Sequence, residues 1–312
     1  MSEQSQSEQI GANGPATDAE VDPEGGFTIV VPAYNEENGI APTLEELLTE
    51  LDALELTVPY EVLVVNDGSS DATGERLKPF VDSGRITLIE HEVNRGYGAA
   101  LKTGVRRAAH EWILITDADG TYPNVHIKDL LPHRAENDMI VGARTGEQRQ
   151  ISWIRRPPKW VLRKLASWLA RRRIPDLNSG FRMMRKPIIK KFFNILPDGF
   201  SFTITITLAM LAGGYAVKYT PINYLKREGK SKIRPIADTL NFLKLIVRTI
   251  MYFDPLRVFL PLAMLFFLGA IGVGVASIAA GGFLDVTTTV LFVTGVQLFA
   301  IGMLADLVNR RT

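Results

Sequence analysis

Two carboxylates, Asp117 and Asp119, stand on either side of Ala118 in the stretch ILITDADGTYP, directly after a run of β-favouring apolar residues. In such a pair, one carboxylate can bind a divalent cation while the other contacts a sugar or ribose hydroxyl. Hard cations such as Mg²⁺ use one or two carboxylates together with phosphate oxygens of a substrate. The alternative is a solvated turn with no chemical role, because a lone D-x-D pattern is common.

The apolar segments that precede these residues and the earlier motifs favour a ligand-binding site over a solvated turn. The stretches FTIVVPA, YEVLVVND, ITLIEHE and WILITDADG are apolar runs separated by helical patterns. Short apolar strands that alternate with helices predict βαβ units and a parallel sheet buried on both faces. Ligands of such sheets gather at the carboxyl ends of the strands. Three of these ends read AYNEE, NDGSSD and DADG, so we expect one shared polar site there.

Several functional classes are excluded or disfavoured. Gly96 and Gly98 have the G-x-G spacing of a dinucleotide loop, but Leu101 stands where the next glycine is required, and no P-loop sequence occurs. The chain has no cysteine, which excludes disulfides and thiolate metal sites. Its formal net charge of +1 gives no general attraction to nucleic acid.

The C-terminal part predicts a membrane hairpin. Val258–Leu284 and Val286–Ala305 contain no charged residue, and each is long enough for a spanning helix, which needs about 20 apolar residues. A pair of buried core helices is the alternative. Arginines flank the two spans at positions Arg248, Arg257, Arg310 and Arg311. By the positive-inside rule, both ends of the hairpin then face the cytoplasm.

Three further segments complete the expected organisation. Residues 1–26 are polar, have no signal-peptide pattern and predict a disordered tail. Residues 159–173, KWVLRKLASWLARRR, predict a basic amphipathic helix in the headgroup region, with packing on the protein's own core as the alternative. Residues 235–255 predict a second interfacial helix. The soluble domain then covers 27–234, and the spans cover about 256–281 and 286–306, within a hairpin region at 256–307.

The order of the motifs VPAYNEE, VVNDGSSDAT, NRGYGAALKTG, TDADGTYP, NSGFR and KREGKSK resembles that of family 2 glycosyltransferases of the GT-A fold. More narrowly, it is similar to dolichol-phosphate mannose synthase and related polyprenyl-phosphate glycosyltransferases, over about Phe27 to Phe253. The resemblance implies a Rossmann-like, mostly parallel α/β domain that requires Mg²⁺ or Mn²⁺. It also implies a nucleotide-sugar donor and a dolichyl or undecaprenyl phosphate acceptor.

The resemblance assigns site residues by motif. Asp119 would bind the metal, and Asp176, Ser179 and Arg182 would lie where donor and acceptor meet, with Asp119, Asp176 and Arg182 as the catalytic set. Arg144, Ser179, Arg182 and Arg227 would contact the acceptor phosphate. The donor would be held by Pro32, Tyr34, Glu36, Val65, Asp67, Lys102, Asp117, Ala118, Arg144, Arg227 and Lys232.

A lipid phosphate acceptor also makes physical sense. An alcohol needs a general base to become a nucleophile. A phosphate monoester has its second ionisation near pH 6, so an anionic oxygen is already present. The protein must instead supply positive charge, and arginine binds phosphate oxygens with its planar fork.

Two departures from the family pattern bear on the substrates. The Q-x-x-R-W sequence of polymerising members is missing, which disfavours a polysaccharide synthase, and Gly120, Thr121 and Tyr122 follow the carboxylate pair. We expect inverting transfer of one hexose, with GDP-mannose as the first donor and UDP-glucose or UDP-N-acetylhexosamine as alternatives. A non-catalytic scaffold is the least favoured function. A homo-oligomer is compatible with two spans per chain.

Overall fold

The computed structural model describes residues 25–145, 164, 167–168, 172–199, 201–225, 246–282 and 286–309. The predicted disordered tail therefore lies outside the described residues, except for 25–26. The same holds for most of the predicted interfacial helix 159–173, for the first part of the second one, and for Arg227 and Lys232.

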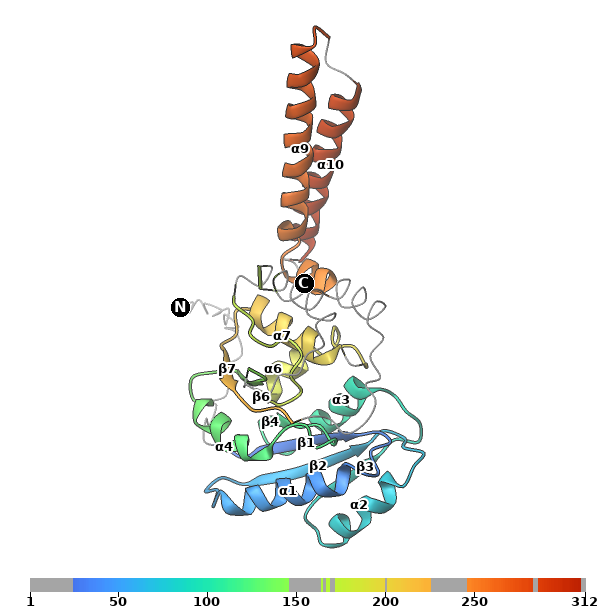
Figure 1. Ribbon diagram of the computed structural model, residues 1–312, viewed down its shortest axis with the longest axis vertical. Helices are drawn as coiled ribbons and strands as arrows, with labels where there is room; N and C mark the ends of the chain where they lie inside the picture. The colour runs from blue at the N-terminus through green and yellow to red at the C-terminus, as the bar shows by residue number, and fades with distance from the viewer. Residues whose placement is uncertain are drawn as a thin grey trace, which may run out of the picture.

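One mixed sheet forms the centre of the soluble body, with strand order β3-β2-β1-β4-β6-β5-β7 (Figure 1). Its pairs β1–β2, β1–β4, β2–β3 and β5–β7 are parallel, whereas β6 runs antiparallel between β4 and β5. The mostly parallel sheet predicted from the apolar runs is thus confirmed. The strands are β1 Phe27–Ala33, β2 Tyr60–Asn66, β3 Thr87–Glu90, β4 Trp112–Ile115, β5 Met139–Ala143, β6 Arg182–Arg185 and β7 Val217–Pro221.

Helices cover both faces of the sheet. Helix α1 buries Ile40, Leu44, Leu47 and Leu51, the spacing of one apolar helix stripe, and shares a core with α2 on one face. Helices α3, α6 and α7 share the core of the other face. The bounds are α1 Ile40–Ala53, α2 Thr73–Asp82, α3 Tyr97–Arg107, α4 Ile127–Leu130, α6 Lys186–Lys191 and α7 Phe202–Ala212, with short 3₁₀ turns η1 Asn124–His126 and η2 Leu131–His133.

The contact between α3 and the sheet depends on a glycine. A Cβ atom added to Gly104 would lie 2.4 Å from Cγ1 of Val30 on β1. Both residues are buried. Helix α3 therefore lies closer to β1 at this position than any residue with a side chain would allow.

Two long apolar helices, α9 Leu256–Ala279 and α10 Val286–Asn309, pack together and project away from the sheet as a hairpin (Figure 1). Both are long and apolar enough to cross a membrane, with mean hydropathies of 2.4 and 1.9. Large apolar side chains on them are exposed, for example Leu268 at 64% and Leu304 at 62%. Buried core helices would not show this, so the alternative from the sequence is wrong and the two-helix hairpin is confirmed.

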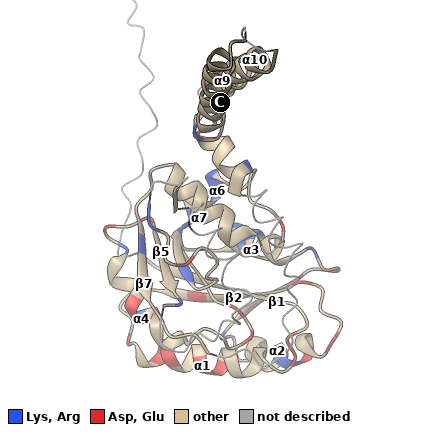
Figure 2. Ribbon diagram, turned by 45° about the horizontal axis from the view of Figure 1, so that its top comes forward, with Lys and Arg blue, Asp and Glu red and all other residues tan. Residues whose placement is uncertain are grey.

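A third apolar cluster connects the hairpin to the soluble body. Residues 246–253 are helical, and Ile246 and Ile250 pack against Ile204 and Leu208 of α7. Phe253 contacts Phe192 at a ring-centroid distance of 5.8 Å. Figure 2 shows acidic residues along α1 and at α4, on the opposite side of the body from the hairpin.

Replacing Gly104 with alanine is expected to lower the free energy of unfolding by about 1 to 3 kcal/mol, because the new methyl group overlaps the β-branched Val30 side chain. Gly74→Ala in α2 is the matched control, since its Cβ would make ordinary contacts with Asn66 Nδ2 at 3.5 Å and Glu90 Oε1 at 3.8 Å. Thermal unfolding in detergent measures both. Equal stability of the two variants would show that α3 is not held by this close approach.

Candidate active site

The predicted polar site forms at the carboxyl ends of β1, β2 and β4. Ala33 pairs with Asn66, and Val30 pairs with Ile115, so the residues that follow these strands meet at one edge of the sheet. Hydrogen bonds join the loops after β1 and β2: Asn35 N–H donates to Ser69 Oγ at 3.0 Å, and Glu36 N–H donates to Thr73 Oγ1 at 2.9 Å. The AYNEE and NDGSSD motifs thus form one continuous surface.

Asp119 is half-buried at this edge, and its side chain has a fixed orientation. Its Oδ1 accepts hydrogen bonds from the backbone N–H of Thr121 at 3.2 Å and from its hydroxyl at 2.6 Å. The carboxylate therefore does not enter the apolar interior. A single carboxylate fits a divalent cation whose other ligands are substrate phosphates and water. Among the residues that the structure describes, no group of three metal-binding side chains offers a complete protein site.

The loop that carries Asp119 rests on the first turn of α1. Thr43 Oγ1 donates to the Ala118 carbonyl at 3.2 Å. A Cβ atom on Gly39 would lie 2.9 Å from the same carbonyl oxygen, so only glycine permits this contact. Ala118 is buried, and its predicted contact with the donor stays a prediction.

Asp117 is half-buried and accepts a hydrogen bond from the Tyr97 hydroxyl at 2.9 Å. Its two carboxylate oxygens face the backbone of Gly180, where a Cβ atom would lie 2.8 Å from Oδ2 and 3.0 Å from Oδ1. The segment before β6 therefore reaches the end of β4.

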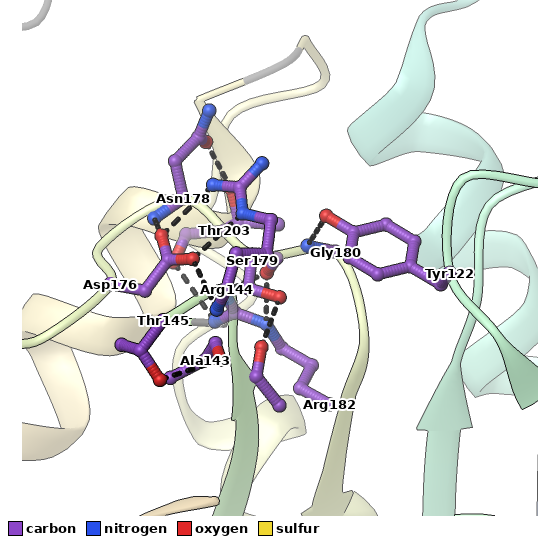
Figure 3. A network of polar contacts seen from close by, with 11 residues as sticks. Tyr122, Ala143, Arg144, Thr145, Asp176, Asn178, Ser179, Gly180, Arg182 and Thr203 are labelled. Carbon is purple, nitrogen blue, oxygen red and sulfur yellow. Dashed lines mark hydrogen bonds and ion pairs between the residues drawn. The ribbon is translucent and has the colours of Figure 1, made fainter. Parts of the chain in front are cut away.

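Arg144 and Asp176 form the strongest ion pair of the site (Figure 3). Arg144 Nε and Nη2 donate to the two Asp176 oxygens at 2.7 and 2.9 Å, and the Arg144 backbone N–H donates at 3.1 Å. Burial alone would raise the pKa of Asp176, but the hydrogen bonds and charge of Arg144 outweigh it and lower that pKa to about 2. Asp176 is therefore ionised and a weak base at neutral pH.

An aromatic cluster lies beside this pair. The Arg144 guanidinium lies 5.2 Å from the centre of the Tyr224 ring, and Tyr224 contacts Tyr122 edge to face at 5.3 Å. Tyr122 stacks on Phe181, and its hydroxyl accepts the Gly180 N–H at 2.8 Å. Burial raises the pKa of Tyr122, so its hydroxyl stays protonated. Through its contact with Gly180, Tyr122 joins the carboxylate loop to the segment before β6 (Figure 3).

Asp67 is buried at the end of β2, where its carboxylate binds the protein itself. Its Oδ1 contacts His91 Nδ1 at 2.6 Å and accepts the Arg95 N–H at 3.0 Å, while Oδ2 accepts the Gly96 N–H at 2.8 Å. His91 Nε2 in turn contacts Thr103 Oγ1 at 3.0 Å. In this structure Asp67 orders the loop before α3, and its predicted contact with a nucleotide stays a prediction.

The environment of Arg182 argues against the catalytic and phosphate-binding roles predicted from its motif. It is fully buried, Nε donates to the Ser179 carbonyl at 2.9 Å, and Nη1 donates to the Thr203 carbonyl and the Thr207 hydroxyl. Nη2 also donates to the Ser179 carbonyl. Burial lowers the pKa of Arg182. Its donors thus bind α7 to the segment before β6.

Two other predicted ligands are also engaged inside the protein. Ser179 is buried, and its hydroxyl donates to the Gly142 carbonyl at 2.6 Å. Lys102 Nζ donates to Asp198 at 2.8 Å, which joins α3 to the turn before α7. These contacts argue against direct substrate binding by either side chain in this conformation.

The remaining predicted donor residues lie at or below the same edge. Tyr34 is exposed at 37%, and Glu36 is half-buried, so both side chains border the surface of the site. Pro32 and Val65 face each other across β1 and β2 and are buried in the sheet. Arg227 and Lys232 lie outside the described residues.

The sequence did not predict a role in the site for Tyr97, Tyr122 or His91, although Tyr97 and His91 contact the predicted site residues Asp117 and Asp67. Tyr97 and Tyr122 lie inside the motifs NRGYGAALKTG and TDADGTYP, where the neighbouring glycines and carboxylates carry the recognisable pattern. His91, at the end of ITLIEHE, offered no pattern of its own.

The comparisons with known proteins agree with this architecture. Residues 28–193 match the family model described as "Glycosyl transferase family 2", and residues 254–310 match the one described as "GtrB C-terminal hairpin". An undecaprenyl-phosphate 4-deoxy-4-formamido-L-arabinose transferase of Pseudomonas aeruginosa is 28% identical over 298 residues, which cover 91% of this chain and 85% of that protein. A dolichyl-phosphate beta-glucosyltransferase of Dictyostelium discoideum is 24% identical over 239 residues, covering 71% and 73%.

The solved structures show the same fold. Glucosyl-3-phosphoglycerate synthase from Mycobacterium tuberculosis, in complex with Mn²⁺, uridine diphosphate and phosphoglyceric acid, aligns with a TM-score of 0.56. It is 17% identical, and the alignment covers 72% of this chain and 78% of the other. The resemblance is that of the GT-A body.

Replacing Asp176 with asparagine is expected to lower the free energy of unfolding at pH 7 by about 2 kcal/mol, because Arg144 loses its charged partner. The folded-state pKa of Asp176 lies below its unfolded value, so its contribution is complete above about pH 4 and disappears as the pH falls through about 2. Unfolding of both proteins followed from pH 7 to pH 2 measures this. A stability difference that stayed constant over that range would contradict the ion-pair explanation.

Proposed function

The chain belongs to glycosyl transferase family 2, and from this premise we propose that it moves one sugar from a nucleotide-sugar to a polyprenyl phosphate at a membrane surface, with inversion at the anomeric carbon. One observation carries the proposal. The carboxylate loop of Asp117 and Asp119 opens at the sheet edge of a soluble body whose chain continues into an exposed apolar hairpin. A transferase with this anchor fits an acceptor that is itself held in lipid.

In the proposed reaction, an anionic oxygen of the lipid phosphate attacks the anomeric carbon. A new carbon–oxygen bond forms there, and the bond to the nucleotide diphosphate breaks with its electron pair leaving on the diphosphate. No proton has to be removed from the nucleophile. This agrees with the state of Asp176, whose pKa of about 2 makes it a weak general base.

Electrostatic repulsion between the two anionic substrates opposes this reaction. Asp119 would hold the divalent cation, and that cation, when bound, would offset the charge that builds up on the leaving diphosphate. Arg144, fixed by Asp176 and by the Tyr224 ring, places a guanidinium at the same edge. Arg227 and Lys232, predicted from KREGKSK, would add positive charge. Mg²⁺ and Mn²⁺ both suit a carboxylate and phosphate oxygens.

For the sugar, we place glucose from UDP-glucose before mannose from GDP-mannose, although the sequence favoured the latter. Support comes from the relatives of Dictyostelium discoideum and Mus musculus, which are both named dolichyl-phosphate beta-glucosyltransferases. The Pseudomonas aeruginosa relative is named for a modified arabinose, so a substituted sugar is the next candidate. The three donors can be compared in a single competition assay.

The proposed orientation puts the soluble body and both chain ends on the cytoplasmic side. Arg248 and Arg257 precede the first span, and Arg310 and Arg311 follow the second. The acidic residues of α1 and α4 lie on the side of the body away from the hairpin, and hence away from anionic lipid headgroups (Figure 2).

Asp119→Ala is expected to reduce sugar transfer to polyprenyl phosphate by at least about a hundredfold, because the cation loses its protein ligand. The melting temperature should stay close to the wild-type value, since the Asp119 side chain is half-buried at the sheet edge and is not part of the apolar core. Asp52→Ala, at an exposed ion pair with Arg85, is the control that should keep full activity. Wild-type turnover by Asp119→Ala would remove the metal assignment.

The acceptor is tested by its headgroup. With radiolabelled donor and Mn²⁺, undecaprenyl phosphate should become labelled with one sugar, whereas undecaprenol, which lacks the phosphate, should give less than about one hundredth of that rate. Labelled product from undecaprenol at a comparable rate would show that the enzyme activates an alcohol. Label in a long polymer would instead favour a polysaccharide synthase.

A further inference from the structure

A line of hydrogen bonds joins the ends of two strands through the start of α3. The Asp67 carboxylate, after β2, binds the backbone N–H groups of Arg95 and Gly96. The next residue, Tyr97, donates its hydroxyl proton to Asp117 Oδ1, after β4, at 2.9 Å. Asp67 thus fixes the backbone from which the Tyr97 side chain reaches Asp117.

The backbone conformation at Gly96 restrains the position of Tyr97. Gly96 has a φ of +102°, a conformation that side chains with a Cβ rarely adopt. A Cβ atom at Gly96 would also lie 2.5 Å from the carbonyl oxygen of Asp198, and that carbonyl accepts the Ala99 N–H at 3.0 Å. The first turn of α3 is therefore held on two sides, by Asp67 and by the turn at Asp198. Tyr97 has little freedom to move away from Asp117.

Asp117 is held from the opposite side by Gly180. The absence of a Cβ there lets both carboxylate oxygens approach the backbone, and the Gly180 N–H is itself held by the Tyr122 hydroxyl at 2.8 Å. The Asp117 carboxylate consequently lies between a phenol hydroxyl and a rigid backbone segment. Such a carboxylate is ordered before any substrate arrives.

The hydroxyl of Tyr97 remains a donor over the whole physiological range. Burial and the neighbouring negative charge of Asp117 raise the pKa of Tyr97 well above its usual value. A neutral tyrosine donor also leaves the negative charge of the carboxylate in place, which an arginine or lysine partner would neutralise.

We propose that Tyr97 is a positioning residue that orients Asp117 toward the donor, and that Asp67, through the backbone of 95–96, holds Tyr97 in place. This inference rests on the proposed function, because it assigns Asp117 to the donor sugar or ribose. Its consequence is specific: loss of the hydroxyl weakens recognition of the donor and leaves the acceptor unaffected, since an oriented carboxylate contributes binding that a mobile one does not.

The test compares Tyr97→Phe with Tyr219→Phe in the full-length protein. Tyr219, on β7, is the matched control because its buried hydroxyl has no hydrogen-bond partner among the described residues. Initial rates are measured against UDP-glucose, GDP-mannose and polyprenyl phosphate in the presence of Mn²⁺. The melting temperature of each variant is recorded under the same conditions.

For Tyr97→Phe we expect KM for the donor to rise about tenfold, the scale of one hydrogen bond to a charged group. KM for polyprenyl phosphate should stay within about twofold, and so should both constants of Tyr219→Phe. A merely structural role would lower the melting temperature and change both KM values together. That result, or a donor KM equal to the wild-type value, would overturn the inference.

Failure of the proposed function gives a different outcome. If the wild-type protein transfers no sugar to polyprenyl phosphate, calorimetric binding of each nucleotide-sugar with Mn²⁺ still tests Tyr97. Weaker binding by Tyr97→Phe than by Tyr219→Phe would then support the positioning role without the acceptor assignment. Equal binding by wild type and Tyr97→Phe, or no binding by the wild type, would overturn it.

Discussion

The ion pair between half-buried Arg144 and buried Asp176 is the interaction on which the rest of the site depends. It joins the end of β5 to the segment that precedes β6, and that segment contributes Gly180, which contacts Asp117 at the end of β4. The same arginine lies on Tyr224, which contacts Tyr122, which in turn holds Gly180. The buried Asp176 carboxylate needs its partner, because loss of Arg144 would leave a desolvated and unpaired charge. The ion pair therefore couples the geometry of the carboxylate loop to the folding of the whole edge.

The arrangement also addresses an electrostatic problem. A reaction between a lipid phosphate and a nucleotide diphosphate brings two anions together, and in a site of low dielectric constant their repulsion is large. Ionised carboxylates of the protein without a positive partner would add to this repulsion. Here Arg144 offsets the charge of Asp176, and backbone N–H groups donate hydrogen bonds to Asp67, while Asp119 remains half-buried at the surface of the edge. Most carboxylates of the site thus serve the architecture, which leaves the cation to offset the negative charge of the substrates.

Much of the fold could be predicted from the sequence, because it depends on local patterns. Apolar runs of strand length predicted the parallel strands, and the charge-free segments predicted the ends of α9 and α10 to within a few residues. The antiparallel β6 was beyond such reasoning, since RMMR is short and polar at both ends. The surroundings of Arg182 could not be predicted either. An arginine in a motif suggests phosphate, but its burial is possible only because α7 and the loop at Ser179 supply acceptors from elsewhere in the chain. The contact of Tyr97 with Asp117 is likewise tertiary, and neither residue signals it alone.

The central claim is that a cation held by Asp119 and the arginine held by Asp176 together bind the diphosphate at the carboxyl ends of the strands. Anomalous diffraction from crystals grown with Mn²⁺ and a nucleoside diphosphate measures this most directly. The expected result is a single manganese peak within coordination distance of an Asp119 oxygen, about 2.0 to 2.3 Å, with the diphosphate lying between that ion and Arg144. A bound diphosphate whose manganese lies away from Asp119, or a nucleotide bound elsewhere on the protein, would contradict it.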